Sequence, residues 1–220
     1  MDGFLIIDKP KGKTSFDIVR DVRRETGVRR VGHGGTLDPL ATGLLVVAVG
    51  KATKLLSNFL GCEKEYEVRA KFGFVSDSYD ADGRIEKVSE RKISMNEIKE
   101  EILRNFIGKI SQLPPKYSAL KVKGKRAADI MRAGGDVELK PRTVLIKKFE
   151  VMDYVWPEVS FRVECGSGTY VRSLVHDLGQ NLGVGAYVLE LRRTKVGDFD
   201  VREAGSSLVS IEDVAKRVEK

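Results

Sequence analysis

The stretch Gly32-His33-Gly34-Gly35-Thr36-Leu37-Asp38-Pro39-Leu40-Ala41-Thr42-Gly43 lies directly before the apolar run Leu44-Leu45-Val46-Val47-Ala48-Val49. The apolar run predicts a buried strand, and the glycines predict a loop whose backbone can approach a bulky ligand closely. Pro39 restricts Asp38 to extended conformations. The loop therefore presents one carboxylate at a set angle, as a catalytic site requires, although an Asp-Pro pair that only caps a turn would look the same.

The composition indicates one folded, basic protein. The chain has 220 residues, of which 41% are hydrophobic, and this length is enough for one substantial core. Its formal net charge of +7 suits a polyanionic partner such as nucleic acid. Cys62 and Cys165 suggest no disulfide framework. No stretch is typical of a signal peptide or a membrane span, so we expect a cytoplasmic protein that does not bind membranes.

Capping residues and hydrophobic periodicity predict the order of the elements. Strands are expected over residues 3–8, 44–49, 64–74, 84–88, 143–155, 159–165 and 186–196, and helices over 14–27, 52–60, 94–107, 125–132, 169–182 and 210–218. Because strands and helices mix without strict alternation, we expect an α+β fold around one mixed sheet flanked by helices. Basic residues accumulate over 111–142 after a Pro-Pro pair, which predicts an inserted lobe.

Three ligand-binding motifs are approached but not completed. Gly12-Lys13-Thr14 looks like the end of a phosphate-binding loop, but Ile7 stands where that motif needs a glycine. Gly166-Ser167-Gly168 begins like a dinucleotide fingerprint, but Val171 replaces its third glycine. The segment from Ser78 to Ser89 imitates a calcium loop without its last acidic ligand, and no zinc spacing occurs. We therefore expect no metal and no cofactor, with a nucleotide-binding enzyme built on Gly166–Gly168 as an open alternative.

Two further segments carry candidate site residues. Tyr66 lies in the alternating stretch over 64–74, where an aromatic side chain that faces the core is the simplest interpretation. Tyr170 and Arg172 are expected at the start of the helix over 169–182. An arginine at a helix N-terminus opposes the helix dipole, so we expect an anionic partner close to it.

These segments, in their order along the chain, resemble the TruB family, the tRNA pseudouridine-55 synthases. The Asp38 loop resembles the motif that carries the family's catalytic aspartate. Lys9-Pro10 is similar to its first motif, and Lys64-Glu65-Tyr66 resembles the motif whose tyrosine stacks on the target base. The resemblance extends from about Gly3 to Phe199, which is nearly the whole chain.

The second half of the chain carries the rest of the resemblance. Cys165 to Leu174 is similar to the motif whose arginine, here Arg172, pairs with the catalytic aspartate. Leu191-Arg192-Arg193 resembles the strand whose leucine lines the uracil pocket. The segment from Pro114 to Lys121, with Gly124-Lys125-Arg126, resembles the RNA-gripping thumb insertion of bacterial members.

The resemblance implies a domain organisation and a substrate. It implies a pseudouridine synthase fold over residues 1–200 with a thumb-like insertion at about 111–142. The short helical tail over 201–220 would stand in place of the RNA-binding PUA domain that members usually carry. The implied partner is the T-arm of tRNA, and we expect a monomer that acts without metal or nucleotide.

The resemblance also implies a role for each candidate residue. Asp38 would be the catalytic carboxylate, which either attacks C1′ of a flipped-out uridine or abstracts a proton from its sugar. Tyr66 would stack on the base, Tyr170 and Leu191 would wall the pocket, and His33 would fill the space that the base leaves. The residues expected to contact RNA are basic: Lys9, Lys116, Lys121, Lys123, Lys125, Arg126, Arg132, Arg142, Arg192 and Arg193.

Two other functions stay open. The stretch from Gly183 to Thr194 also resembles the guide-RNA-dependent catalytic subunit of H/ACA-type particles, although the basic insertion favours the stand-alone bacterial type. The second possible function is that of a module that binds or folds tRNA without catalysing a reaction. The presence of Asp38, Tyr66 and Arg172 argues against it.

Overall fold

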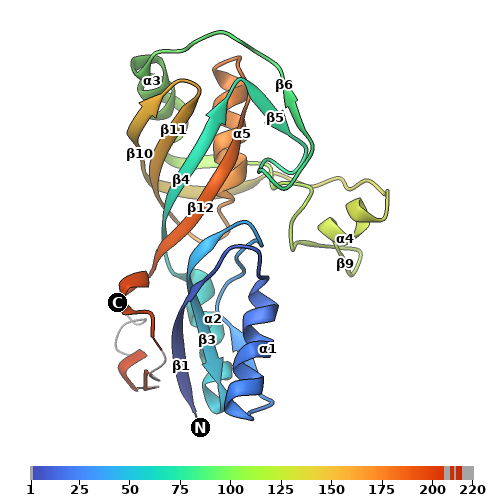
Figure 1. Ribbon diagram of the computed structural model, residues 1–220, viewed down its shortest axis with the longest axis vertical. Coiled ribbons are helices and arrows are strands. Elements are labelled where there is room, and N and C mark those ends of the chain that lie inside the picture. Colours follow the sequence, from blue (N-terminus) through green and yellow to red (C-terminus); the bar gives the residue numbers. More distant parts are fainter. Residues whose placement is uncertain (1, 206–208, 211, 215–220) are drawn as a thin grey trace. The chain divides into compact units, whose positions relative to one another are not determined.

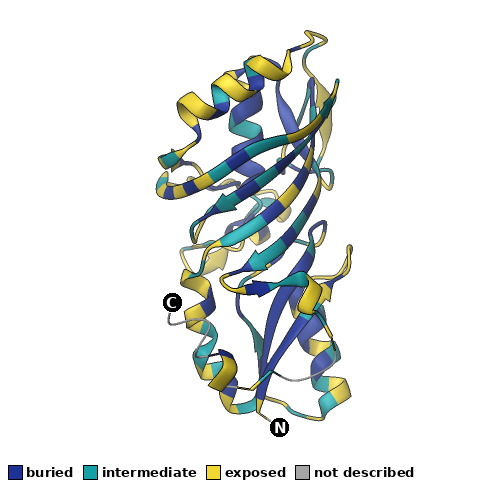
Figure 2. Ribbon diagram, turned by 90° about the vertical axis from the view of Figure 1, so that its left-hand side faces the viewer, coloured by how far each residue is buried: buried dark blue, intermediate teal, exposed yellow. Residues whose placement is uncertain are grey.

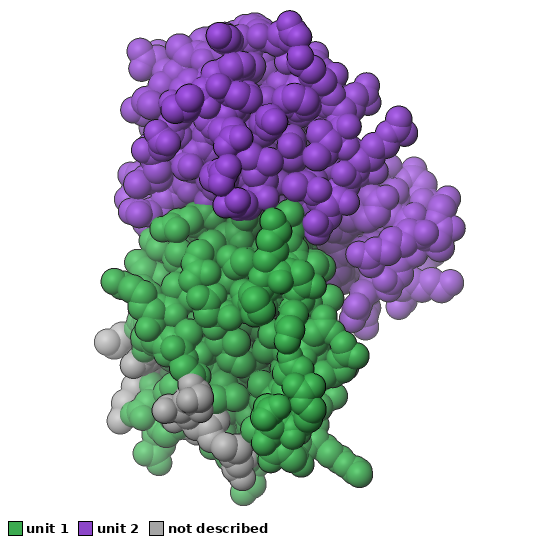
Figure 3. Space-filling view, viewed as in Figure 1, with its two compact units in different colours: residues 1–67, 191–220 green, residues 68–190 purple. Residues whose placement is uncertain are grey.

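The computed structural model describes residues 2–205, 209–210 and 212–214, and the chain divides into two compact units (Figures 1 and 3). Unit 1 comprises residues 1–67 and 191–220, and unit 2 comprises residues 68–190. Strands β4 (Lys64–Phe72) and β12 (Ala186–Val196) are neighbours in the sheet, and each passes from one unit into the other.

Unit 1 is built on strand β3 (Thr42–Val49), the apolar run that the sequence predicted to be buried. It pairs antiparallel with β1 (Gly3–Lys9) and β2 (Val31–His33), and parallel with the end of β12. Side chains of β3 pack with aromatic rings of Phe4, Phe59 and Phe199. The loop between β2 and β3, which contains Asp38, is thus attached to the most deeply buried strand of this unit.

Of the helices predicted for unit 1, α1 begins and ends where the sequence indicated. Helix α1 (Ser15–Thr26) starts with a capping box between Thr14 and Asp17 and ends at Gly27, whose φ of +69° favours glycine. The predicted helix over 52–60 is instead a 3₁₀ helix, η1 (Gly50–Leu55), that continues into α2 (Leu56–Gly61). Strand β13 (Phe199–Asp200) and the turn η2 (Val201–Glu203) follow β12.

The sheet of unit 2 has the order β12-β4-β11-β10-β7, with β11 (Glu158–Cys165), β10 (Arg142–Val155) and β7 (Gly108–Gln112). Buried and more exposed residues alternate along these strands, as Figure 2 shows. Helices α3 (Met95–Asn105) and α5 (Val171–Asn181) lie in this unit. Strands β5 (Phe74–Ser76) and β6 (Ile85–Lys87) form a separate hairpin. The α+β class and the mixed sheet are confirmed.

The basic segment forms a small lobe that Figure 1 shows beside the strands of unit 2. It contains a hairpin of β8 (Lys121–Val122) and β9 (Lys125–Arg126), followed by helix α4 (Ala127–Arg132). The sequence predicted this helix but neither the hairpin nor β7. Part of the helix predicted over 210–218 lies outside the described residues. Within the described part of the chain, no helix is long and apolar enough to cross a membrane.

Candidate active site

The Asp38 loop of unit 1 is fastened through its backbone. The Leu37 amide donates to Ser15 Oγ at 2.8 Å, and the same hydroxyl donates to the Leu37 carbonyl at 3.1 Å. The Pro39 carbonyl accepts from the Gly12 amide at 2.8 Å. Leu37 is buried, whereas Asp38 is only half-buried. The backbone on both sides of Asp38 is therefore fixed, and Asp38 itself is not fully buried.

Arg193 of β12 ties this loop to β3. Its side chain is 2% exposed, and its guanidinium donates to the carbonyls of Leu44 at 2.8 Å, Gly35 at 3.2 Å and Thr36 at 3.4 Å. Gly43 has a φ of +100°, and a Cβ there would lie 2.2 Å from the Arg193 carbonyl oxygen. The glycine that ends the motif is thus required by the close approach of β12.

Lys9 is a second buried cation beside the loop. Its ammonium donates to the carbonyls of Pro10 at 3.0 Å and Lys13 at 2.6 Å. Burial lowers the pKa of Lys9, and the negative charge of Asp38 opposes that shift. Lys9 and Arg193 were expected to contact RNA. In the structure both groups are buried and bond to backbone carbonyls, which organises the loop, and contact with RNA stays a prediction for both.

The other candidates in unit 1 lie at the end of β2 and on the strands β4 and β12. His33, at the end of β2, is half-buried, and burial together with the positive charge of Arg193 lowers its pKa, so its imidazole is neutral at pH 7. Tyr66 and Leu191 are buried side chains on the adjacent strands β4 and β12. Their roles toward a flipped base stay predictions.

Arg172 occupies the first turn of α5 in unit 2, as predicted. It is buried and forms an ion pair with Asp80 at 3.1 Å. The same guanidinium donates to the carbonyls of Ser78 at 2.7 Å and Tyr117 at 2.9 Å. An anionic partner was expected from the helix dipole, and Asp80 meets that expectation.

Asp80 itself was not identified as a site residue from the sequence. Its carboxylate accepts from Ser78 Oγ at 2.5 Å and from the Asp82 amide at 3.1 Å, and Ser76 Oγ donates to its carbonyl at 2.6 Å. These residues belong to the segment whose sequence resembles a calcium loop. Several serine and aspartate residues precede Gly83, and this pattern could have indicated a polar turn; in the structure that turn contacts the buried Arg172.

Tyr170, the residue before α5, is positioned by an amide side chain. Its backbone amide donates to Gln112 Oε1 at 2.8 Å, and Gln112 Nε2 donates to its carbonyl at 3.0 Å. The guanidinium of Arg142 lies 5.4 Å from the centroid of the Tyr170 ring, a cation–π distance. Arg142, expected to contact RNA, thus packs against a predicted pocket residue.

The remaining basic candidates differ in how they are paired. Arg192 forms a two-pronged pair with Asp8 at 2.6 and 3.0 Å. Lys116 pairs with Asp136 at 2.6 Å, and Arg132 lies 3.6 Å from Asp129. The exposed members of the hairpin in the basic lobe, which we call the thumb cations, are Lys121, Lys123, Lys125 and Arg126. Contact with RNA stays a prediction for all of these.

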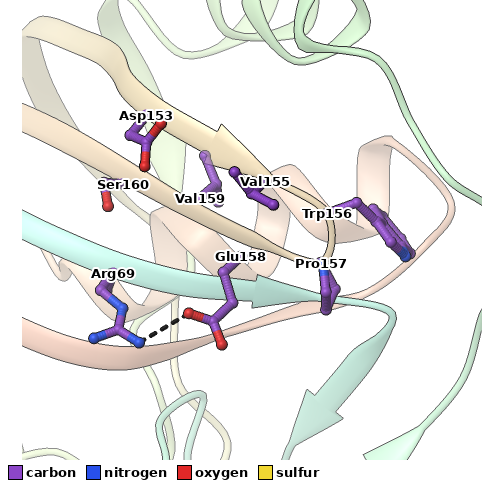
Figure 4. A pocket seen from close by; sticks show the side chains of 8 residues that line it. All are labelled: Arg69, Asp153, Val155, Trp156, Pro157, Glu158, Val159 and Ser160. Carbon is purple, nitrogen blue, oxygen red and sulfur yellow. Dashed lines mark hydrogen bonds and ion pairs between the residues drawn. The ribbon is translucent and has the colours of Figure 1, made fainter.

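One pocket in unit 2 lies apart from these residues (Figure 4). It lies at the turn between β10 and β11, where an ion pair of 2.8 Å joins Arg69 and Glu158 beside Trp156. None of the predicted site residues lines it. The candidate chemistry therefore belongs to the Asp38 loop and to the start of α5, not to this pocket.

Comparisons with known proteins match most of the chain. Residues 23–171 match the family model of the TruB family pseudouridylate synthase N-terminal domain, and residues 172–220 match that of the tRNA pseudouridylate synthase B C-terminal domain. The tRNA pseudouridine synthase B of Endomicrobium trichonymphae is 48% identical over 93% of this chain and 89% of that protein. The enzyme of the same name from Aquifex aeolicus is 44% identical over 94% of this chain and 72% of its own length.

A solved structure shares the fold. The crystal structure of a Cbf5-Nop10-Gar1 complex contains a chain that is 32% identical, with a TM-score of 0.71, over 97% of this chain. This chain spans about half of that one, 54%. The mixed sheet, the family models and the named relatives together define a pseudouridine synthase, an isomerase. Within that class, the chain belongs to the TruB family.

Proposed function

We propose that this chain converts uridine to pseudouridine in the T-loop of tRNA, at position 55, with Asp38 as the catalytic carboxylate. The observation that carries the proposal is the geometry of the Asp38 loop. A half-buried aspartate stands on a backbone held by Ser15, Gly12 and Arg193. The relatives named tRNA pseudouridine synthase B support tRNA as the substrate.

The reaction needs a carboxylate near C1′ and little else. The N1–C1′ bond breaks, the uracil turns, and C5 joins C1′; the proton on C5 then leaves and N1 takes one up. Asp38 either attacks C1′, as in retaining glycosidases, or removes a proton from the sugar. The base must first leave its stack, which costs a few kcal/mol, and Tyr66 would then stack on it.

By the family resemblance, Arg172 is the arginine that pairs with the catalytic aspartate, and this pairing with Asp38 is part of the proposal. A guanidinium binds both oxygens of a carboxylate and keeps it ionised. Asp80 and the carbonyls of Ser78 and Tyr117 fix that guanidinium within unit 2. Arg172 is thus a rigid group rather than a mobile surface side chain.

The proposed partner is the T-arm of tRNA, bound by a monomer in the cytoplasm. The thumb cations support it, because exposed lysine and arginine side chains on a hairpin are suited to phosphate contacts. Arg192 and Lys116 already bond to carboxylates, so contact with RNA would require them to exchange those partners.

The test uses the purified chain and an unmodified tRNA transcript, without guide RNA, nucleotide or added metal. Pseudouridine has the mass of uridine, so the nucleosides are separated by chromatography and the position of the product is mapped. We expect one pseudouridine, in the T-loop. Salt-sensitive binding without any product would contradict the proposal and leave a binding module.

A second candidate is a guide-RNA-dependent synthase. The observation that favours it is the TM-score of 0.71 to a chain of a Cbf5-Nop10-Gar1 complex. The two candidates separate in the same assay, because a guide-dependent enzyme forms product only when a complementary guide RNA and its protein partners are added.

A further inference from the structure

The turn over residues 76–83 contains a strained residue that the mechanism above does not use. Tyr79 has a φ of +66°, in the left-handed region that residues with a Cβ rarely adopt. Its ring stacks on the imidazole of His176 in α5, with centroids 3.8 Å apart and planes within 10°. A contact with the helix thus accompanies a backbone conformation that is unfavourable for tyrosine.

Helix α5 contacts this turn from one face. His176 follows Arg172 by four residues, a spacing that places both side chains on the same side of a helix. Arg172 bonds to the Ser78 carbonyl and to the Asp80 carboxylate, the residues on either side of Tyr79. The helix therefore engages three consecutive residues: a carbonyl, a ring and a carboxylate.

The stack is a contact between neutral rings. Burial lowers the pKa of His176, so the imidazole is uncharged at pH 7. Burial, with a further contribution from the charge of Asp177, raises the pKa of Tyr79 and keeps its hydroxyl protonated. Backbone bonds complete the arrangement, since the Tyr79 amide donates to the Ser76 carbonyl at 3.1 Å and the Val188 amide donates to the Tyr79 carbonyl at 3.0 Å.

We propose that Tyr79 and His176 are positioning residues, whose stack fixes the 76–83 turn and thereby sets the orientation of Asp80 against Arg172. This inference rests on the proposed function, in which Arg172 acts on the catalytic aspartate. A small displacement of Asp80 would turn the guanidinium, and misplacement of a catalytic group slows chemistry without a matching loss of substrate affinity.

Four variants separate the ring contact from general stability. Tyr79→Phe keeps the ring, whereas Tyr79→Gly removes the whole side chain in a residue that tolerates the positive φ. His176→Ala removes the other half of the stack. Arg91→Ala is the matched control, because Arg91 donates to the Leu182 carbonyl at the C-terminal end of α5 at 2.9 Å and does not touch the turn.

The experiment measures the single-turnover rate on an unmodified tRNA, the Kd for that tRNA and the Tm of each variant. We expect Tyr79→Gly and His176→Ala to slow the chemical step by about 10-fold with Kd changed by less than about 2-fold. Tyr79→Phe should restore the wild-type rate. Arg91→Ala should lower the Tm and leave the rate unchanged.

A double-mutant cycle tests whether the Tyr79–His176 stack acts through Asp80. If the stack acts through Asp80, His176→Ala should add little further loss in an Asp80→Asn background. Additive losses, unchanged rates in both single variants, or an equal loss in Arg91→Ala would overturn the positioning role while the wild-type activity stands. An inactive wild-type protein would instead overturn the proposed function, and this inference with it.

Discussion

Each unit carries an aspartate in a glycine-containing turn beside a buried arginine, but the two carboxylates are used differently. In unit 1, Arg193 directs its hydrogen bonds to backbone carbonyls, and Asp38 stays half-buried. In unit 2, Arg172 pairs with the carboxylate of Asp80, which is 4% exposed. The backbone of the Asp38 loop is thus held by hydrogen bonds with Ser15, Gly12 and Arg193, whereas the Asp80 turn is also held through its carboxylate.

Under the proposed function, this difference distinguishes the reacting carboxylate, Asp38, from a supporting one, Asp80. Removing one partner of a buried ion pair leaves an uncompensated charge and costs about 3–5 kcal/mol, so Asp80 is tied to the stability of its turn. The backbone around Asp38 is held by Ser15 and Arg193, and Asp38 itself is only half-buried. A half-buried carboxylate on a fixed backbone is suited to act on a substrate.

The largest expected effect is that of Asp38→Asn. The amide keeps the shape of the side chain and removes its charge and nucleophilicity, so turnover should fall by at least about 1000-fold. The Kd for tRNA and the Tm should stay close to wild type, because the loop is fastened through its backbone. Rapid-quench assays with nucleoside separation measure the rate, and substantial turnover would remove the catalytic role from Asp38.

Arg172→Lys should be the next most damaging change. One ammonium cannot replace a guanidinium that bonds to Asp80 and two carbonyls, so we expect turnover to fall by about 10- to 100-fold. Arg69→Lys is the control in the same unit, since Arg69 is exposed and paired with Glu158 and Glu190. Near-normal turnover in Arg172→Lys would argue against the proposal that the guanidinium must bind both oxygens of a carboxylate.

Arg193→Gln tests how much the hydrogen bonds from Arg193 to backbone carbonyls stabilise the Asp38 loop. Loss of a buried cation with three carbonyl partners should lower the free energy of unfolding by about 2–4 kcal/mol, measured by denaturant titration. The dependence of tRNA affinity on salt should change little, because this group is buried and bonds to backbone carbonyls. The neighbouring Arg192→Gln, which loses a partly exposed pair with Asp8, should cost less than about 1 kcal/mol.

Changes in the thumb cations should have the smallest effect. Replacing Lys121 and Lys125 with glutamine should leave the chemical step and the Tm unchanged, since both side chains are exposed. Each lost phosphate contact should flatten the slope of log affinity against log salt by about 0.9 or less. An unchanged slope in the double variant would show that these lysines do not contact RNA. The matched control is Lys87→Gln, an exposed lysine paired with Glu90.

Local signals in the sequence were sufficient for much of the fold. The capping boxes at Thr14 and Ser94 predicted the starts of α1 and α3, and both boxes are present. The alternation over 64–74 predicted which face of β4 is buried, although β4 itself ends at Phe72. Strand β7 was missed, because Gly108–Gln112 has little apolar alternation and is a strand through its pairing with β10.

The sequence predicted the parts of the candidate site that depend on neighbouring residues along the chain. The Asp38 loop and the position of Arg172 follow from glycine, proline and helix-start patterns. The burial of Lys9 and Arg193 does not, because it depends on carbonyls that the fold brings to them from distant segments. The pairing of Asp80 with Arg172 joins residues far apart along the chain, and only the need for an anion near the start of α5 pointed toward it.

The most direct test of the account compares Asp38→Asn with Asp80→Asn under single-turnover conditions on the same unmodified tRNA, with binding measured in parallel. We expect no measurable pseudouridine from Asp38→Asn at wild-type affinity. We expect slowed but measurable product, together with a lowered Tm, from Asp80→Asn. Product from Asp38→Asn, or complete loss from Asp80→Asn at an unchanged Tm, would contradict the assignment of chemistry to one aspartate and of support to the other.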